Sequence, residues 1–227
     1  MTNTDLDLLL LFNGSDSPFL DQWALTITST WTWLFFFLIM FIVVIKNNEK
    51  VSQVALVVMA CALCMLLSAG MIEFVAKPLG ARVRPSHDPA LASVIDLARG
   101  YKASGFSFFS GHSSNTMALA VFFALLIRNR NFTCFILLWS LLNAWSRLYL
   151  GVHYPSDVGA GLLWGIIVGV IVFLIYIHFF MRTIPKLHFI SSQYTRTGYA
   201  LLDVNLLCTA LVLTLFYTIF RAILLAH

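Results

Sequence analysis

Residues 77–85 read KPLGARVRP, residues 110–112 read SGH, and residues 146–157 read SRLYLGVHYPSD. The sequence around these three stretches is strongly apolar. Charged and imidazole side chains are costly to place in or near a bilayer, so ionisable groups there generally mark a functional site. We therefore predict that the three stretches come together in space and form one site.

The composition is that of a membrane protein. Of the 227 residues, 60% are hydrophobic and 11% are charged, whereas soluble domains carry about a quarter charged residues. We predict an all-α, polytopic membrane protein in which residues 1–227 form a single domain. The net charge of +4 comes without a basic run suited to nucleic acid. The four cysteines lie in apolar runs without a nearby histidine, which argues against a redox or metal site.

The apolar runs predict a bundle of six transmembrane helices, since about 20 apolar residues are needed to cross a bilayer. The expected spans are residues 24–45, 52–76, 112–127, 132–149, 157–180 and 202–225. The first apolar run is too short to span, so residues 1–22 are expected to hold an interfacial helix and a turn. Residues 78–109 are rich in proline and glycine. They predict a long extramembrane active-site loop, with a short helix near 90–98.

Counting spans places all three polar stretches on one side of the membrane, together with both chain ends. The opposite loops hold seven basic residues, and the cluster side holds four once the three proposed site cations are set aside. The seven are Lys46, Lys50, Arg128, Arg130, Arg182, Lys186 and Arg196. Because cytoplasmic loops carry an excess of Lys and Arg, we expect the site to face the periplasm or the exterior.

The charged residues suit a bound phosphate group. A phosphomonoester carries roughly two negative charges near neutral pH, and Lys77, Arg84 and Arg147 offer cations to bind it. Ser110 and Gly111 lie where the third span begins. A helix amino terminus, a closely approaching backbone and a hydroxyl group would add hydrogen-bond donors there. We predict that these residues together bind the phosphate.

Two histidines and an aspartate suit phosphoryl transfer. Asp157 follows His153 by four residues, which is one helical turn, and can orient its ring. This favours His153 as the nucleophile that forms a phosphohistidine. His112, from another helix, would protonate the leaving oxygen and later activate water. The cations can stabilise the transferred charge, so we expect neither a metal nor another cofactor.

The spacing of these residues resembles the motifs of the type 2 phosphatidic acid phosphatase superfamily. Six residues separate Lys77 from Arg84-Pro85, then Ser110-Gly111-His112 follows, and finally Arg147, His153 and Asp157 are separated by five and three residues. The resemblance implies a bacterial membrane lipid phosphatase with the residue roles given above. Phe109 stands where the family has proline. We expect this difference to alter the rigidity of the loop and to leave the chemistry intact.

Other polar residues near the site admit structural explanations. Glu73 precedes Lys77 by one helical turn, so a salt bridge between them is favoured over a catalytic role. Arg82 either contacts a lipid headgroup or is solvated. His87 is not expected to touch the substrate.

The expected activity is hydrolysis of a lipid phosphomonoester or diphosphate. Candidate substrates are undecaprenyl diphosphate, lipid A, phosphatidylglycerol phosphate and phosphatidic acid. One alternative is a phosphotransferase that passes the phosphoryl group from the phosphohistidine to another lipid or sugar. A non-enzymatic anion transporter is a weaker alternative, because the charges gather at one face instead of the bilayer midplane and no inverted repeat is evident.

Overall fold

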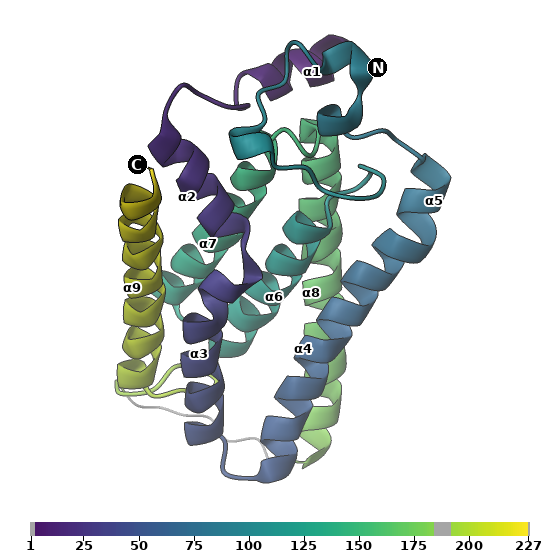
Figure 1. Cartoon of the computed structure of the whole chain (residues 1–227). Coiled ribbons are helices and arrows are strands. Elements are labelled where there is room, and N and C mark those ends of the chain that lie inside the picture. Colours follow the sequence, from purple (N-terminus) through teal and green to yellow (C-terminus); the bar gives the residue numbers. More distant parts are fainter. Residues whose placement is uncertain (1–2, 184–191, 227) are drawn as a thin grey trace.

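The computed structural model describes residues 3–183 and 192–226, and this part of the chain is all-α apart from an isolated bridge between Tyr194 and Ala200. The helices are α1 (Asn3–Leu10), α2 (Pro18–Thr28), α3 (Leu34–Lys46), α4 (Val51–Met71), α5 (Lys77–Gly80), α6 (Gly111–Ile127), α7 (Arg130–Tyr149), α8 (Pro155–Thr183) and α9 (Leu201–Leu225). α6 packs against α4, α7 and α8 (Figure 1). The predicted helical class is therefore confirmed.

Several of these helices can cross a membrane. Val51–Gly80, Pro155–Phe180 and Leu201–Leu225 are each long and apolar enough, and α2 with α3 makes a fourth if the bent pair forms one span. α6 is apolar but has 17 residues, which is short of the roughly 20 that a span needs. The chain is thus an integral membrane protein with several apolar helices. The count of six spans stays a prediction.

The first expected span, residues 24–45, is not one straight helix. α2 and the following helical segment are bent by 71°. At the bend Thr32 Oγ1 donates to the Thr26 carbonyl at 2.6 Å, and Trp33 Nε1 donates to the Ile27 carbonyl at 2.9 Å. Carbonyls in the last turn of a helix lack helical partners, so these side chains satisfy them and fix the bend. The apolar run at residues 24–45 did not by itself predict this bend.

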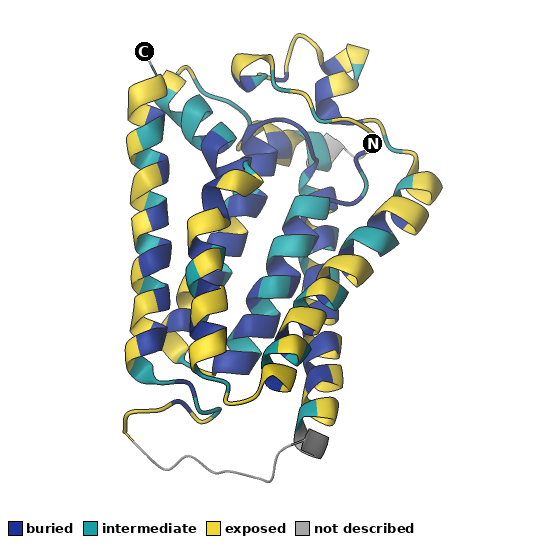
Figure 2. Cartoon of the chain, turned by 60° about the horizontal axis from the view of Figure 1, so that its bottom comes forward, coloured by how far each residue is buried: buried dark blue, intermediate teal, exposed yellow. Residues whose placement is uncertain are grey.

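Exposed residues lie along the outward faces of the helices (Figure 2), and many of them are large and apolar. Large exposed side chains occur on α3, α4, α8 and α9; examples are Leu38, Leu66, Leu174 and Phe216. Such extensive apolar exposure is rare on soluble proteins. It is what a surface in contact with lipid tails requires.

The loop that carries Arg84 lies at the end of the bundle where both described chain ends are found (Figure 1). α1 packs on this loop, because Leu9 is fully buried against Leu91 and Ile95. The prediction of a short helix near 90–98 was wrong. The loop forms separate 3₁₀ turns at Pro89–Leu91 and Ala98–Gly100, since its apolar residues are used to anchor α1.

α8 meets α6 along a row of glycines spaced by four residues: Gly161, Gly165 and Gly169. A Cβ atom added at Gly165 would lie 2.5 Å from the Ser114 carbonyl oxygen, and the other two glycines face backbone oxygens of the same segment at similarly short distances. Small residues let helix backbones approach closely, which is a common way for helices to associate in a membrane. The row fixes the start of α6 against the start of α8, where the polar stretches meet.

Gly165→Ala is expected to destabilise the protein by about 1–3 kcal/mol, because the new methyl group meets backbone that cannot move aside. Gly159→Ala is the matched control in the same helix, since no atom lies within 4 Å of its added Cβ. The better helix propensity of alanine should stabilise that variant by up to about 1 kcal/mol. Thermal unfolding of the purified protein in detergent measures both changes. Equal stability of the two variants would contradict the close α6–α8 contact.

Candidate active site

A cavity of about 460 Å³ lies where the three polar stretches meet. Six of the predicted site residues line it: Lys77, Arg84, Gly111, His112, Arg147 and His153. The other two, Ser110 and Asp157, are fully buried behind its wall. Both histidines and all three predicted cations therefore share one cavity, as the spacing predicted.

Helix ends and loops present these side chains. Lys77 follows a π-helical turn, Ile72–Ala76, at the end of α4, and such turns are frequent at functional sites. Arg147 lies in the last turn of α7. The loop is tied to α8 because the Ser110 backbone N–H donates to the Asp157 carbonyl at 3.0 Å. Phe109 is buried against Ile72, so a large apolar side chain anchors the loop where the family has proline.

Two arginines of the cavity are buried without a carboxylate partner. Arg84 is 5% exposed and Arg147 is 2% exposed, and neither forms a salt bridge within the described residues. Arg84 donates to the carbonyls of Gly105 and Val152, each at 2.9 Å. Arg147 donates from Nη1 to Thr28 Oγ1, while its Nε has no hydrogen-bond partner in the described part of the chain. Buried charge is unfavourable unless it is paired, so this arrangement suits a bound anion.

His153 faces these cations with a defined tautomer. Its Nε2 lies 3.0 Å from Arg84 Nη1, and a guanidinium can only donate, so Nε2 is the acceptor. The ring proton is therefore assigned to Nδ1, which lies 3.7 Å from Asp157 Oδ2 and 3.5 Å from Ser107 Oγ. The lone pair that a nucleophile needs points toward the cations of the cavity.

The ring of His153 is neutral near pH 7. Burial lowers its pKa to about 4; the nearby Asp157 carboxylate opposes this, and the positive charges of Arg147 and Arg84 act in the same direction as burial. A neutral imidazole can attack phosphorus, whereas an imidazolium cannot. The cations that would hold a phosphate thus also keep the ring unprotonated. Arg84 remains charged at neutral pH, although burial and Arg147 lower its own pKa to about 10.

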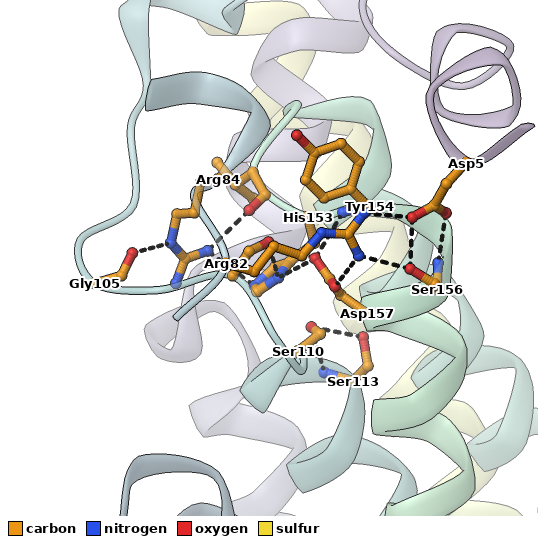
Figure 3. A network of polar contacts seen from close by, with 12 residues as sticks. Asp5, Arg82, Arg84, Gly105, Ser110, Ser113, His153, Tyr154, Ser156 and Asp157 are labelled. Carbon is orange, nitrogen blue, oxygen red and sulfur yellow. Dashed lines mark hydrogen bonds and ion pairs between the residues drawn. The ribbon is translucent and has the colours of Figure 1, made fainter. Parts of the chain in front are cut away.

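Asp157 is fully buried, and its two oxygens have different partners (Figure 3). Oδ2 accepts from Ser107 Oγ and, at 3.0 Å, from the Tyr154 backbone N–H, while Oδ1 accepts from Arg82 Nη1 at 2.7 Å. Tyr154 directly precedes α8, so the backbone contact is half of a capping box. The contact between His153 and Asp157 therefore arises at a helix start, not from a helical turn that contains both.

The start of α6 combines a structural residue with two cavity residues. Ser110 Oγ caps the helix by accepting from the Ser113 backbone N–H at 3.4 Å and from its hydroxyl at 2.9 Å. Gly111 and His112 then turn toward the cavity, and the His112 ring hydrogen-bonds to the backbone of Thr28. An anion in the cavity would thus lie near a helix amino terminus, which favours negative charge.

Lys77 forms the expected salt bridge with Glu73, and both line the cavity. Arg82 matches neither expected alternative, because it pairs with Asp157 and with Asp5 of α1. Ser107 and Asp5 were missed at the sequence level. Neither belongs to a recognisable local pattern, and their roles depend on how the loop and α1 fold over α8.

Comparison with known proteins agrees with this geometry. Residues 57–181 match the PAP2 superfamily. The chain is 36% identical over 167 residues to the lipid A 4'-phosphatase of Bacteroides thetaiotaomicron, covering 73% of each. It is 33% identical over 177 residues to the lipid A 4'-phosphatase of Porphyromonas gingivalis, covering 76% of this chain and 72% of that one.

A solved structure gives the same result. LpxE of Aquifex aeolicus superposes with a TM-score of 0.55 at 25% identity, over 74% of this chain and 93% of that one. The chain therefore belongs to the PAP2 superfamily, in the branch of bacterial membrane phosphatases that resemble lipid A 4'-phosphatases.

Proposed function

We propose that this lipid phosphatase hydrolyses a phosphate ester of lipid A, with His153 as its nucleophile. The observation that carries the proposal is the pair of buried arginines without carboxylate partners, in a cavity that also holds two histidines. A phosphate dianion supplies the countercharge, and arginine can bind it with two parallel hydrogen bonds. The names of the two bacterial relatives favour lipid A over undecaprenyl diphosphate, phosphatidylglycerol phosphate and phosphatidic acid.

In the first step the phosphate accepts hydrogen bonds from Lys77, Arg84 and Arg147, so that Arg84 Nη1 leaves His153 Nε2. The Nε2 lone pair attacks phosphorus, and the bond between phosphorus and the lipid oxygen breaks. The electron pair stays on that oxygen, which takes a proton from His112. The bound dianion favours the protonated form of His112 before this transfer. The products are the lipid alcohol and a phosphohistidine.

In the second step water enters the cavity and attacks phosphorus, while His112 takes its proton. The phosphorus–nitrogen bond breaks, and its electron pair returns to Nε2 of His153. Inorganic phosphate leaves. The proton stays on Nδ1 of His153 throughout, and the nearby Asp157 carboxylate stabilises the positive charge on the ring. The cations and the amino terminus of α6 stabilise the transferring group, so the chemistry needs no metal.

We further propose that the acyl chains lie in a second, apolar cavity of about 360 Å³. It is lined by Phe37, Met40, Phe41, Val44, Val57, Val58, Cys61, Ala62, Met65, Leu119 and Phe123. Met65 is one helical turn from Ala69 of the phosphate cavity, and Leu119 is one turn from Asn115. The two cavities thus use the same faces of α4 and α6, one after the other along each helix.

Membrane topology is a proposal of the same kind. We propose that α6 and α7 also cross the bilayer, which makes six spans in a single domain of residues 1–227. The orientation is supported by Lys46 and Lys50, because they lie at the junction of α3 and α4, at the end of the bundle away from the cavity (Figure 1), and cytoplasmic loops are rich in Lys and Arg. Lys186 lies outside the described residues. A tag fused after α9 should be accessible to an impermeant reagent in spheroplasts, whose cytoplasmic membrane is intact, and protection of that tag there would contradict the orientation.

Purified protein should release inorganic phosphate from lipid A in mixed micelles faster than from undecaprenyl diphosphate, phosphatidylglycerol phosphate or phosphatidic acid. His153→Ala should lower kcat on lipid A by about 10³-fold or more, because the covalent route is lost. A colorimetric phosphate assay measures both. Undiminished activity of His153→Ala would contradict the assignment of the nucleophile, and a faster rate with another lipid would contradict the substrate.

His112→Ala should be nearly inactive on lipid A but should still react with an aryl phosphate, whose acidic leaving group needs no proton. The second step then lacks its base, so the phosphohistidine should accumulate. The phosphohistidine is measured as phosphate label that remains on the protein after a quench in alkali, where phosphohistidine survives. Loss of labelling with the aryl phosphate would contradict the acid–base role of His112. His112→Ala combined with His153→Ala is the unlabelled control.

Ala62→Trp should fill the apolar cavity and raise KM for long-chain lipid A. Each displaced methylene group costs about 0.8 kcal/mol, so loss of two raises KM roughly tenfold. Leu66→Trp is the matched control on α4, because Leu66 is 67% exposed and lies outside that cavity. KM for a soluble aryl phosphate should be unchanged in both variants. Equal KM values for long-chain lipid in the two variants would contradict the acyl-chain proposal.

A further inference from the structure

Arg82 joins three parts of the chain outside the phosphate cavity (Figure 3). Its Nη1 donates to Asp157 Oδ1 and to Ser156 Oγ, each at 2.7 Å, and its Nη2 donates to Asp5 Oδ2 at 2.6 Å. The guanidinium also stacks on the Tyr154 ring, 3.7 Å from its centroid. Its terminal nitrogens are thus occupied by protein acceptors, and Arg82 does not line the cavity. Unlike Arg84, it is not placed to bind phosphate.

Asp5 holds Arg82 in this position from α1. Its Oδ1 accepts from the Ser156 backbone N–H at 3.0 Å, and its Oδ2 accepts from Ser156 Oγ at 2.6 Å as well as from Arg82. Burial alone would raise the pKa of Asp5, but the hydrogen bonds from Ser156 and Arg82 lower it. The carboxylates of Asp5 and Asp157 raise the pKa of Arg82, although burial alone would lower it. Both groups are therefore charged near neutral pH, and the contact persists there.

The carboxylate of Asp157 needs this support. Its distance of 3.7 Å to His153 Nδ1 is too long for a strong hydrogen bond, so His153 alone would not fix its orientation. Ser107 and Tyr154 hold one oxygen, and Arg82 holds the other. With both oxygens held, the plane of the carboxylate is fixed relative to the ring.

Arg82 also partly neutralises the negative charge of Asp157. The other groups facing His153 are Arg84 of the loop, Arg147 of α7, His112 of α6 and Ser107, while Glu73 of the π turn is paired with Lys77. Asp157 is therefore the one carboxylate directly at the ring among the described residues. A carboxylate that is paired with a guanidinium stabilises the imidazolium less than an unpaired one does.

We propose that Arg82 is a positioning residue for phosphoryl transfer, held by Asp5 of α1, which aligns Asp157 with His153 and keeps the nucleophile unprotonated. The proposal rests on the proposed roles of His153 and Asp157. It makes the amino-terminal helix part of the support of the active site, although Asp5 precedes His153 by 148 residues in the sequence.

Arg82→Gln should lower kcat on lipid A by roughly ten- to a hundredfold, the effect typical of losing an outer partner of a site residue. KM should change little, because Arg82 does not line the cavity. The acidic limb of kcat/KM should move to higher pH, since Asp157 then acts on His153 without competition. The substrate titrates identically with both enzymes, so this movement reports on the protein. Arg82→Lys should restore part of the rate, and Arg99→Gln, an exposed loop arginine, is the matched control.

Asp5→Asn tests the same link from a residue that touches neither the cavity nor Asp157. It should lower kcat severalfold and move the acidic limb in the same direction. Asp7→Asn on the exposed side of α1 is its control and should behave like the wild-type protein. Thermal unfolding shows whether Arg82→Gln folds. If it does not, Asp5→Asn still tests the positioning role of Arg82.

An unchanged acidic limb and kcat in folded Arg82→Gln or Asp5→Asn would overturn the proposal, as would a loss of rate without any movement of the limb. His153→Ala separates this outcome from failure of the proposed function. If His153→Ala is inactive while the Arg82 and Asp5 variants match the wild-type protein, the positioning role alone fails. If His153→Ala is fully active, both the positioning role and the proposed mechanism fail.

Discussion

Uncompensated positive charge is the constraint on which the rest of the site depends. Arg84 and Arg147 lie almost fully inside the protein without a carboxylate partner in the described residues. Such charges are tolerated only where hydrogen bonds hold them, and here carbonyl and hydroxyl groups of surrounding segments do so. These neutral acceptors leave the charge itself unneutralised. Attraction for a dianion and a neutral imidazole at His153 both follow from that single arrangement.

The two carboxylates near the cavity are each paired with a cation. Asp157 reaches His153 with one oxygen only, and Arg82 takes the other. Glu73 lines the cavity but is bound to Lys77. A free carboxylate in the cavity would repel a bound phosphate and would raise the pKa of His153. The protein can therefore use an aspartate to orient the ring without losing the electrostatic attraction that binds the substrate.

Much of this organisation could be predicted from the sequence, because the signals were local. The helices at residues 112–127, 132–149 and 202–225 were expected within a few residues of α6, α7 and α9, and the motif spacing brought six predicted residues to one cavity. Features that depend on distant contacts could not be predicted. The bend after α2 depends on Thr32 and Trp33 bonding to carbonyls of the preceding helix. The role of Arg82 depends on an aspartate 77 positions away in α1.

The glycines of α8 are an intermediate case. Their spacing of four residues is visible in the sequence and is typical of close helix contacts, but the spacing alone does not identify the partner helix. The structure supplies α6 as that partner, and its amino terminus holds Ser110, Gly111 and His112. Close approach along α6 and α8 therefore does more than stabilise the bundle. It sets the distance between the segment that carries His112 and the helix start that orients His153.

The placement of the cavity also explains how one site can serve both a lipid and water. The hydrolytic route needs the lipid alcohol to depart before water can reach phosphorus. The apolar cavity continues along α4 and α6 on one side of the phosphate position, while the polar loop with Tyr101 and Lys102 bounds the other. With the acyl chains in the apolar cavity, as proposed, the lipid product would withdraw along the helices while water enters from the loop side. Separate routes of this kind favour transfer of the phosphoryl group to water over its return to the lipid.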